Sequence, residues 1–120
     1  MSRSRASAKA AGTRFERLIA DCFADHVDDR IDRRTKTGNK DKGDIGGLRH
    51  MGQRVVLEVK DYGGRLNVGP WLNEADIERG NDDAGVAAVI AKRRGQADPL
   101  DQTVLMTVRD LISLLTGQRP

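Results

Sequence analysis

The sequence predicts one α/β domain in which helices flank a mixed five-stranded sheet. Two observations carry this prediction. Residues 54–60 (RVVLEVK) and 85–91 (GVAAVIA) are short, apolar and rich in β-branched side chains, as buried strands are. Segments with helical periodicity lie before the first of these strands and between the two. The predicted order is α-β-β-β-α-β-β-α: three strands in a meander, a crossover helix, and two further strands before the last helix.

The first half of the chain begins with small, polar and basic residues, so residues 1–8 are expected to form a disordered tail ahead of a single domain at 9–120. A helix is predicted from about residue 10 to residue 24, because apolar side chains recur there at i, i+3, i+4 and i+7: Phe15, Leu18, Ile19 and Cys22. A weak strand at 27–34, a polar loop at 35–43 and a strand at 44–48 are expected to follow.

The second half continues with a turn-rich linker at 61–69 and a helix at 71–79, which Pro70 begins and Gly80-Asn81 ends. We expect the acidic side chains of this helix to face solvent. A strand at 103–107 and a helix at 109–116 complete the domain, and Gly117 lies just past the helix end. The last helix is predicted to direct Leu111, Leu114 and Leu115 inward, although it could also be an oligomer contact.

Charge is unevenly distributed along this chain of net charge +3. Basic residues gather near the N-terminus and at 30–42, which suggests a polyanionic partner, while a solvated surface is the alternative. The basic residues expected to contact a DNA backbone are Lys9, Arg14, Arg33, Arg34, Lys36, Lys40, Lys42 and Arg93. No apolar run reaches the length of a membrane span, and the basic N-terminus has no hydrophobic segment of a secretory signal. We therefore expect a cytoplasmic protein that has no membrane partner.

Two acids and a lysine form the most informative pattern. Side chains alternate along a strand, so Glu58 and Lys60 share one face at the end of the strand at 54–60. A turn near residues 50–53 would bring Asp44 across a hairpin from Glu58. Two carboxylates are typical ligands of Mg²⁺, which completes its shell with water and substrate phosphate. Lys60 would then orient a water molecule or balance charge on the phosphate.

These residues resemble the motif of the PD-(D/E)xK, or restriction-endonuclease-like, nuclease superfamily. Asp44 matches the first acid and Glu58-Val59-Lys60 matches the second half, while Gly43 stands where the family has proline. Residues 12–17 (GTRFER) look like the first-helix signature of archaeal-type Holliday junction resolvases and related phage nucleases. The resemblance covers roughly residues 9–95 and implies a restriction-endonuclease-like fold.

The resemblance also implies roles for two further groups. Glu16 would complete the acidic set, directly or through water, and the Val59 carbonyl could add a backbone ligand to Mg²⁺ beside Asp44 and Glu58. The alternative for Glu16 is structural, because Thr13 and Glu16 have the spacing of a capping box at a helix start.

The expected function is that of a Mg²⁺-dependent, structure-selective DNA endonuclease with Glu16, Asp44, Glu58 and Lys60 as catalytic residues; Mn²⁺ is a plausible substitute. Within this class the resemblance favours a homodimeric Holliday junction resolvase acting on four-way DNA, in a host cytoplasm if phage-encoded. The alternatives are a phage or mobile-element repair or nicking nuclease, a non-catalytic DNA-binding module, and a structural protein whose motifs arose by chance.

Overall fold

The centre of the sheet consists of strands β4 (Gln53–Lys60) and β5 (Val86–Ala91), which run parallel with Val55 opposite Val86 and Lys60 opposite Ala91. All of β5 and residues 55–59 of β4 are buried. Parallel neighbours require a crossover connection, and helix α2 (Val68–Asn81) provides it. Both central strands lie within one residue of their predicted bounds, and the crossover helix begins three residues earlier and ends two residues later than predicted.

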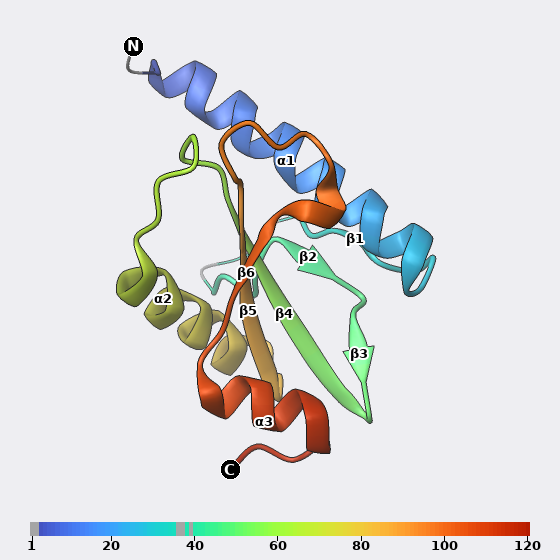
Figure 1. Ribbon diagram of the computed structural model, residues 1–120. Coiled ribbons are helices and arrows are strands. Elements are labelled where there is room, and N and C mark those ends of the chain that lie inside the picture. The colour runs from blue at the N-terminus through green and yellow to red at the C-terminus, as the bar shows by residue number, and fades with distance from the viewer. Residues whose placement is uncertain (1–2, 36–37, 39) are drawn as a thin grey trace.

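The computed structural model describes residues 3–35, 38 and 40–120, and Figure 1 shows the order of their elements. Around the centre lie α1 (Arg5–His26), β1 (Asp32–Arg33), β2 (Ile45–Gly46), β3 (Arg49–His50), the short 3₁₀ helix η1 (Pro99–Asp101), β6 (Thr103–Leu105) and α3 (Val108–Thr116). Among these described residues, three α-helices and a mixed six-stranded sheet confirm the α/β class. None of these helices is both long and apolar enough to cross a membrane.

The sheet has one strand more than predicted. Its order is β1-β2-β4-β5-β6, with β3 pairing separately with β4, and every pairing except β4–β5 is antiparallel. The strand predicted at 44–48 is confirmed only at residues 45–46, because Gly47 adopts a φ of +87° and separates β2 from β3. A Cβ at this position would lie 2.7 Å from the Arg30 carbonyl oxygen, so the close approach requires glycine.

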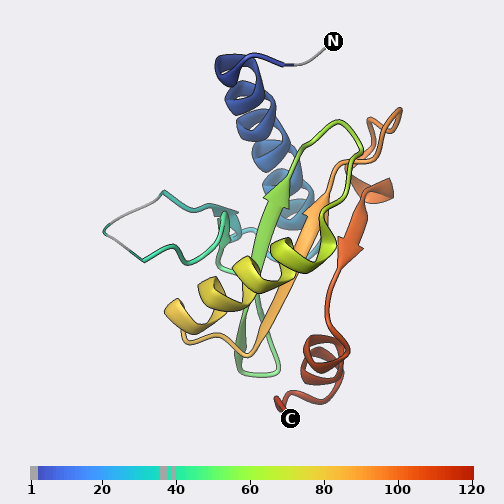
Figure 2. The ribbon, with the colours of Figure 1, turned by 90° about the vertical axis from the view of Figure 1, so that its left-hand side faces the viewer.

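Two hydrophobic cores lie on opposite faces of the sheet, under α1 and α2 (Figure 2). Along β4, Val55, Leu57 and Val59 pack into the α1 core, whereas Val56 packs into the α2 core. This alternation places Glu58 and Lys60 on one face, as the sequence predicts, and α2 covers that face. The register of β4 therefore decides which helix the two polar side chains meet.

Helix α1 begins earlier than expected. Its N-cap is Ser4, whose Oγ accepts a hydrogen bond from the Ser7 N–H, so residues 5–8 are helical rather than part of a tail. Glu16 consequently lies in the middle of the helix, about three turns beyond the Ser4 N-cap. The capping-box interpretation of Thr13 and Glu16 is therefore wrong.

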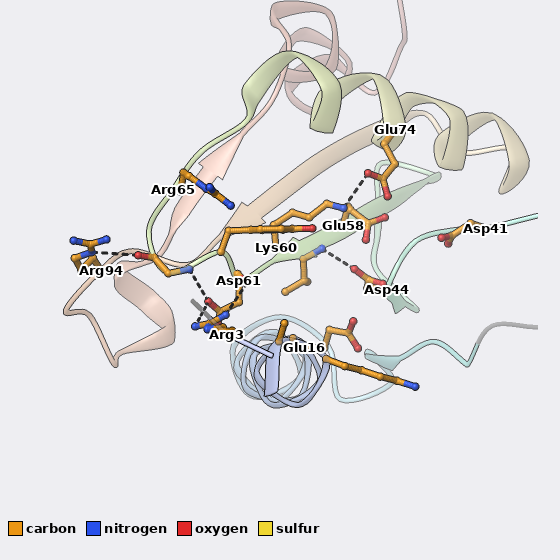
Figure 3. A pocket seen from close by; sticks show the side chains of 16 residues that line it. Arg3, Glu16, Asp41, Asp44, Glu58, Lys60, Asp61, Arg65, Glu74 and Arg94 are labelled. Atoms are coloured by element: carbon orange, nitrogen blue, oxygen red, sulfur yellow. Dashed lines mark hydrogen bonds and ion pairs between the residues drawn. The ribbon is translucent and has the colours of Figure 1, made fainter. Parts of the chain in front are cut away.

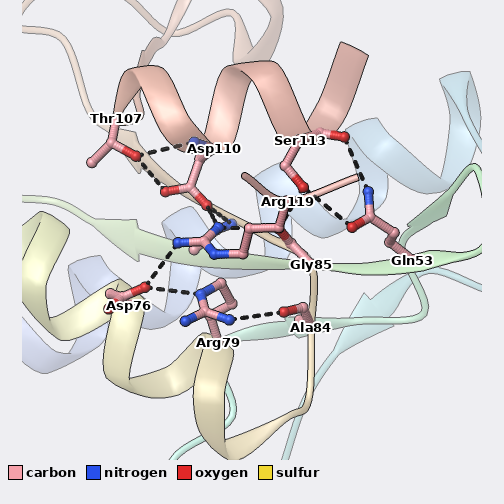
Figure 4. Close-up of polar contacts among 10 residues, drawn as sticks. Gln53, Asp76, Arg79, Ala84, Gly85, Thr107, Asp110, Ser113 and Arg119 are labelled. Atoms are coloured by element: carbon pink, nitrogen blue, oxygen red, sulfur yellow. Dashed lines mark hydrogen bonds and ion pairs between the residues drawn. The ribbon is translucent and has the colours of Figure 1, made fainter. Parts of the chain in front are cut away.

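Helix α3 packs against the domain through a different face from the one predicted. Leu111 and Leu115 are 44 % and 68 % exposed, while Asp110 and Ser113 face inward; of the three predicted core leucines, only Leu114 packs partly against the core. The cause is a polar network (Figure 4), in which Asp110 accepts hydrogen bonds from the Ala87 N–H at 3.0 Å and from Arg119 at 2.6 Å. Ser113 donates to the Gly85 carbonyl at 2.8 Å. Polar side chains thus anchor α3 to the start of β5.

We expect Asp110→Ala to lower the free energy of unfolding by about 3 kcal/mol, because it leaves the buried Ala87 N–H without its acceptor and removes the closer of the two carboxylates that pair with Arg119. Urea unfolding followed by circular dichroism measures the change. Asp25→Ala, at an exposed position of α1, is the matched control and should stay within about 0.5 kcal/mol of the parent. Equal stability of the two variants would contradict an anchoring role for Asp110.

Candidate active site

An open cleft of about 850 Å³ lies at the carboxyl end of β4, between the first half of α1, the loop after β4 and α2 (Figure 3). Acidic side chains form part of its wall: Glu16, Asp41, Asp44, Glu58, Asp61 and Glu74. Basic side chains also line it: Arg3, Lys9, Lys60, Arg65 and Arg94. The cleft thus combines carboxylates, which can bind a cation, with cations that suit an anionic ligand.

The two acids predicted as a pair, Asp44 and Glu58, do lie together. The Asp44 N–H donates to the Leu57 carbonyl at 3.0 Å, and the Asp44 carboxylate accepts from the Val59 N–H at 2.8 Å (Figure 3). Asp44 is thereby fixed across from β4, where its carboxyl neighbours that of Glu58 in the cleft. Gly43 permits this approach, because a Cβ there would lie 2.7 Å from Val56 Cγ1.

Two acids that were not predicted from the sequence, Asp41 and Glu78, lie close to Glu58. One carboxylate oxygen from each of Asp41, Glu58 and Glu78 lies within 4.8 Å of the other two. Glu58 and Glu78 are only 4 % and 2 % exposed. Glu58 Oε2 and both carboxylate oxygens of Glu78 accept no hydrogen bond from the described part of the chain. Buried carboxylate oxygens without a donor are costly unless a cation binds them or a proton neutralises them.

The burial of Glu78 contradicts the prediction that the acids of α2 all face solvent. Trp71, Ala75 and Glu78 are the buried residues of this helix, at i, i+4 and i+7. The spacing from Trp71 was therefore a signal for the inward position of Glu78. It was overlooked because a glutamate within an acidic segment is ordinarily a surface residue.

Burial strongly affects the ionisation of these acids. It raises the pKa of Asp44 to about 8, and the neighbouring Glu58 carboxyl adds to the rise. Burial likewise raises the pKa of Glu58 to about 8, with a further contribution from Glu78. Burial raises the pKa of Glu78 to about 7, and nearby negative charges, that of Asp41 first, contribute as well. The cluster therefore holds protons near neutral pH in the absence of a cation, and a bound divalent cation would replace them.

Lys60 lies beside the acids as predicted, with a partner that was not predicted. Its ammonium donates to Glu74 Oε2 of α2 at 2.9 Å. Burial lowers the pKa of Lys60, but the Glu74 hydrogen bond and the charges of Glu58 and Glu74 outweigh it and raise the pKa overall. Lys60 is consequently a protonated group at the cleft wall.

Glu16 reaches the cleft from α1 and forms an ion pair with one of the predicted DNA-contacting residues. Its Oε2 accepts from Arg33 Nε and Nη2 at 3.2 and 3.1 Å. The structure thus brings Glu16 to the same cleft as Asp44 and Glu58, while Asp41, Glu58 and Glu78 form the compact trio.

The predicted DNA-contacting residues are only partly at the cleft. Lys9 lines it, whereas Arg14, Lys40 and Lys42 are exposed elsewhere, and Lys36 lies outside the described residues. Arg34 pairs with Asp82 at 3.0 Å and donates to the Lys42 carbonyl, so it stabilises the loop before β2 instead of lining the cleft.

At the end of β5, the neighbouring residues Arg93 and Arg94 differ in position. Arg93 donates to the Asp101 carbonyl and does not line the cleft. Arg94 does line it, together with Arg3 and Arg65. The sequence contained a signal that Arg65 and Arg94 would lie at the cleft. Each follows shortly after the carboxyl end of a central strand, and the carboxyl ends of parallel neighbours lie at the same edge of the sheet.

Comparisons of the chain with protein-family models, with curated proteins and with solved structures give no match. The function of the cleft must therefore be inferred from its own chemistry.

Proposed function

We propose that this chain is a Mg²⁺-dependent endonuclease that hydrolyses phosphodiester bonds in DNA, with its active site in the cleft at the end of β4. One observation carries the proposal: the half-buried Asp44 and the buried Glu58 converge beside a protonated Lys60 in a cleft whose walls also carry arginine and lysine. The resemblance to the PD-(D/E)xK motif supports the same assignment.

The residues fit a hard divalent cation. Carboxylate and carbonyl oxygens are the ligands that Mg²⁺ and Mn²⁺ prefer, and Glu58 offers an oxygen that accepts no hydrogen bond from the described residues. Asp44, Glu58 and the Val59 carbonyl would hold the ion. When bound, Mg²⁺ supplies Lewis acidity and lowers the pKa of a coordinated water.

The other groups of the cleft act on the phosphate and on the DNA backbone. Lys60 donates a hydrogen bond to a phosphate oxygen and stabilises the negative charge that develops on it during hydrolysis. Glu74 keeps the Lys60 ammonium in place at 2.9 Å until the substrate enters. Lys9, Arg65 and Arg94 contact flanking phosphates, and Glu16 on the α1 side completes the acidic set.

The substrate we propose is branched DNA, with the four-way junction as the first candidate and nicked or flapped DNA as the alternative. Contacts to phosphates position a protein on DNA without reading its bases, so recognition here depends on DNA shape. A homodimer, which the resemblance implies, would present two such clefts to one junction.

The experiment that tests this function offers purified protein four-way, flapped, nicked and linear DNA, each with Mg²⁺, Mn²⁺ or EDTA. We expect cleavage of at least one branched form with either cation and none with EDTA. Binding without cleavage of any form would favour a non-catalytic DNA-binding module instead. Cleavage that persists in EDTA would contradict the metal-dependent mechanism.

DNA binding is expected to weaken steeply with salt, because the basic residues of the cleft release counterions from phosphates. The combined variant Lys9→Ala, Arg65→Ala and Arg94→Ala should reduce the slope of log K against log salt by about 2 to 3. Fluorescence anisotropy with Ca²⁺ in place of Mg²⁺ measures binding. Arg49→Ala, on exposed β3 outside the cleft, is the control and should keep the parent slope. A flat salt response of the parent protein would contradict backbone contact.

A further inference from the structure

The acid Glu58 has neighbours on two sides, and only one of them belongs to the predicted motif. Asp44 approaches it from the start of β2, whereas Glu78 approaches it from α2 and Asp41 from the loop before β2. Asp44 is not a member of the group whose carboxylate oxygens all lie within 4.8 Å of one another. The arrangement therefore contains a second set of ligands that shares only Glu58 with the first.

We propose that Asp41, Glu58 and Glu78 form a second site for a hard divalent cation, distinct from the site at Asp44. The inference rests on the proposed function in one respect, because Glu58 would be a ligand in both sites. The other two ligands, Asp41 and Glu78, are not part of the nuclease motif. The site ties three elements together: the loop before β2, strand β4 and helix α2.

Burial without hydrogen bonds is the first argument for this site. Both oxygens of Glu78 and one of Glu58 accept no hydrogen bond among the described residues, and both side chains are more than nine-tenths buried. Basic side chains on the surrounding elements bond to other acids: Lys60 to Glu74, Arg34 to Asp82 and Arg79 to Asp76. These three described cations thus pair with other acids, and the buried oxygens of Glu58 and Glu78 that lack a donor are left open to an external cation.

The fixed position of Asp41 is the second argument. Asn81, at the end of α2, donates from its side chain to the Asp41 carbonyl at 2.8 Å, and the Gly43 N–H donates to the Asp41 carboxylate at 2.9 Å. Asn81 follows Glu78 by about one helical turn. The same end of α2 therefore supplies one ligand and holds the segment that supplies another.

The spacing of the ligands indicates the class of ion. Oxygens on opposite sides of a Mg²⁺, Mn²⁺ or Ca²⁺ ion are about 4.2 to 4.8 Å apart, given bonds of about 2.1 to 2.4 Å. Three oxygens within 4.8 Å of one another satisfy this limit. The ligands are all carboxylates, which excludes a preference for soft ions that bind thiolate or imidazole. A bound ion here would also hold Glu58 in place for the neighbouring site.

The test counts Mn²⁺ ions bound to the full chain without DNA, by electron paramagnetic resonance and by titration calorimetry. We expect about two ions per chain in the parent and about one in Glu78→Gln or in Asp44→Asn, each of which removes one of the two sites. Asp41→Asn should match Glu78→Gln, since an asparagine oxygen can still accept from the Gly43 N–H. Asp83→Asn removes an equal charge at an exposed position where asparagine suits the positive φ, and it should bind like the parent.

Each outcome separates this inference from the proposed function. If Glu78→Gln and Asp41→Asn bind Mn²⁺ as the parent does, the second site is overturned, whatever the cleavage assays show. If the parent binds one ion that either Asp44→Asn or Glu78→Gln removes, the acids form a single site and the inference is also overturned. If Glu78→Gln loses one ion while the parent cleaves no DNA, the second site stands and the nuclease proposal fails.

Discussion

Glu58→Gln is expected to reduce Mg²⁺-dependent DNA cleavage by at least about a thousandfold, which corresponds to about 4 kcal/mol of transition-state stabilisation. Glu58 is the acid that both proposed cation sites share, so a neutral amide there removes a charged ligand from each. DNA affinity should change by less than about threefold, because the residues proposed to contact phosphates are untouched. Single-turnover cleavage of the preferred branched DNA, with anisotropy for binding, measures both quantities.

The control for Glu58→Gln is Asp83→Asn, which removes an equal charge from an exposed site and should cleave at the parent rate. Loss of activity in Glu58→Gln does not follow from unfolding, because replacing a buried acid among acids removes repulsion and should preserve or raise stability. Asp44→Asn should lose cleavage to a similar extent. Parent-like cleavage by either variant would show that these acids are not the active site.

The cation-free protein is expected to lose at least about 3 kcal/mol of stability as the pH rises from about 5 to about 8. In the folded state, Asp44 and Glu58 have pKa values of about 8 and Glu78 of about 7. In the unfolded chain these groups ionise near their ordinary values of about 4. Between the two limits the folded state binds more protons, so the stability is fully present below about pH 4 and is lost as pH rises through the folded pKa values.

Urea unfolding at several pH values, with EDTA or with Mg²⁺, measures this dependence. Mg²⁺ should restore stability at pH 8, because an ion that binds only the folded state adds RT ln(1 + [L]/Kd). The double variant Glu58→Gln and Glu78→Gln should flatten the pH profile and lose most of the Mg²⁺ effect. A parent protein whose stability in EDTA rises from pH 5 to pH 8 would show that the acids are not buried together.

Local patterns in the sequence correctly predicted those features of the fold that depend on residues close together in the chain. The alternation along β4 correctly placed Glu58 and Lys60 on one face, and the apolar segment at 85–91 correctly predicted a buried strand. The approach of Asp44 to Glu58 followed from a hairpin expected near residues 50–53, and Met51 and Gly52 do adopt the positive φ of a tight turn there.

Other features depend on contacts between distant residues, which local patterns do not reveal. The inward orientation of Asp110 on α3 depends on the Ala87 N–H and on Arg119, so the apolar stripe of that helix predicted the wrong face. Arg34 was assigned to DNA because its pairing with Asp82, far away in sequence, could not be foreseen. For Glu78, by contrast, the spacing from Trp71 was available, and the usual exposure of glutamate outweighed it.

The most direct test of the central claim, that buried acids at the end of β4 hold a divalent cation, is anomalous diffraction from crystals grown with Mn²⁺. We expect an anomalous peak within bonding distance of a Glu58 carboxylate oxygen, with Asp44 or with Asp41 and Glu78 as its other protein ligands. Crystals with Mn²⁺ that show Glu58 hydrogen-bonded to a neighbouring carboxyl group and no peak in the cleft would contradict it.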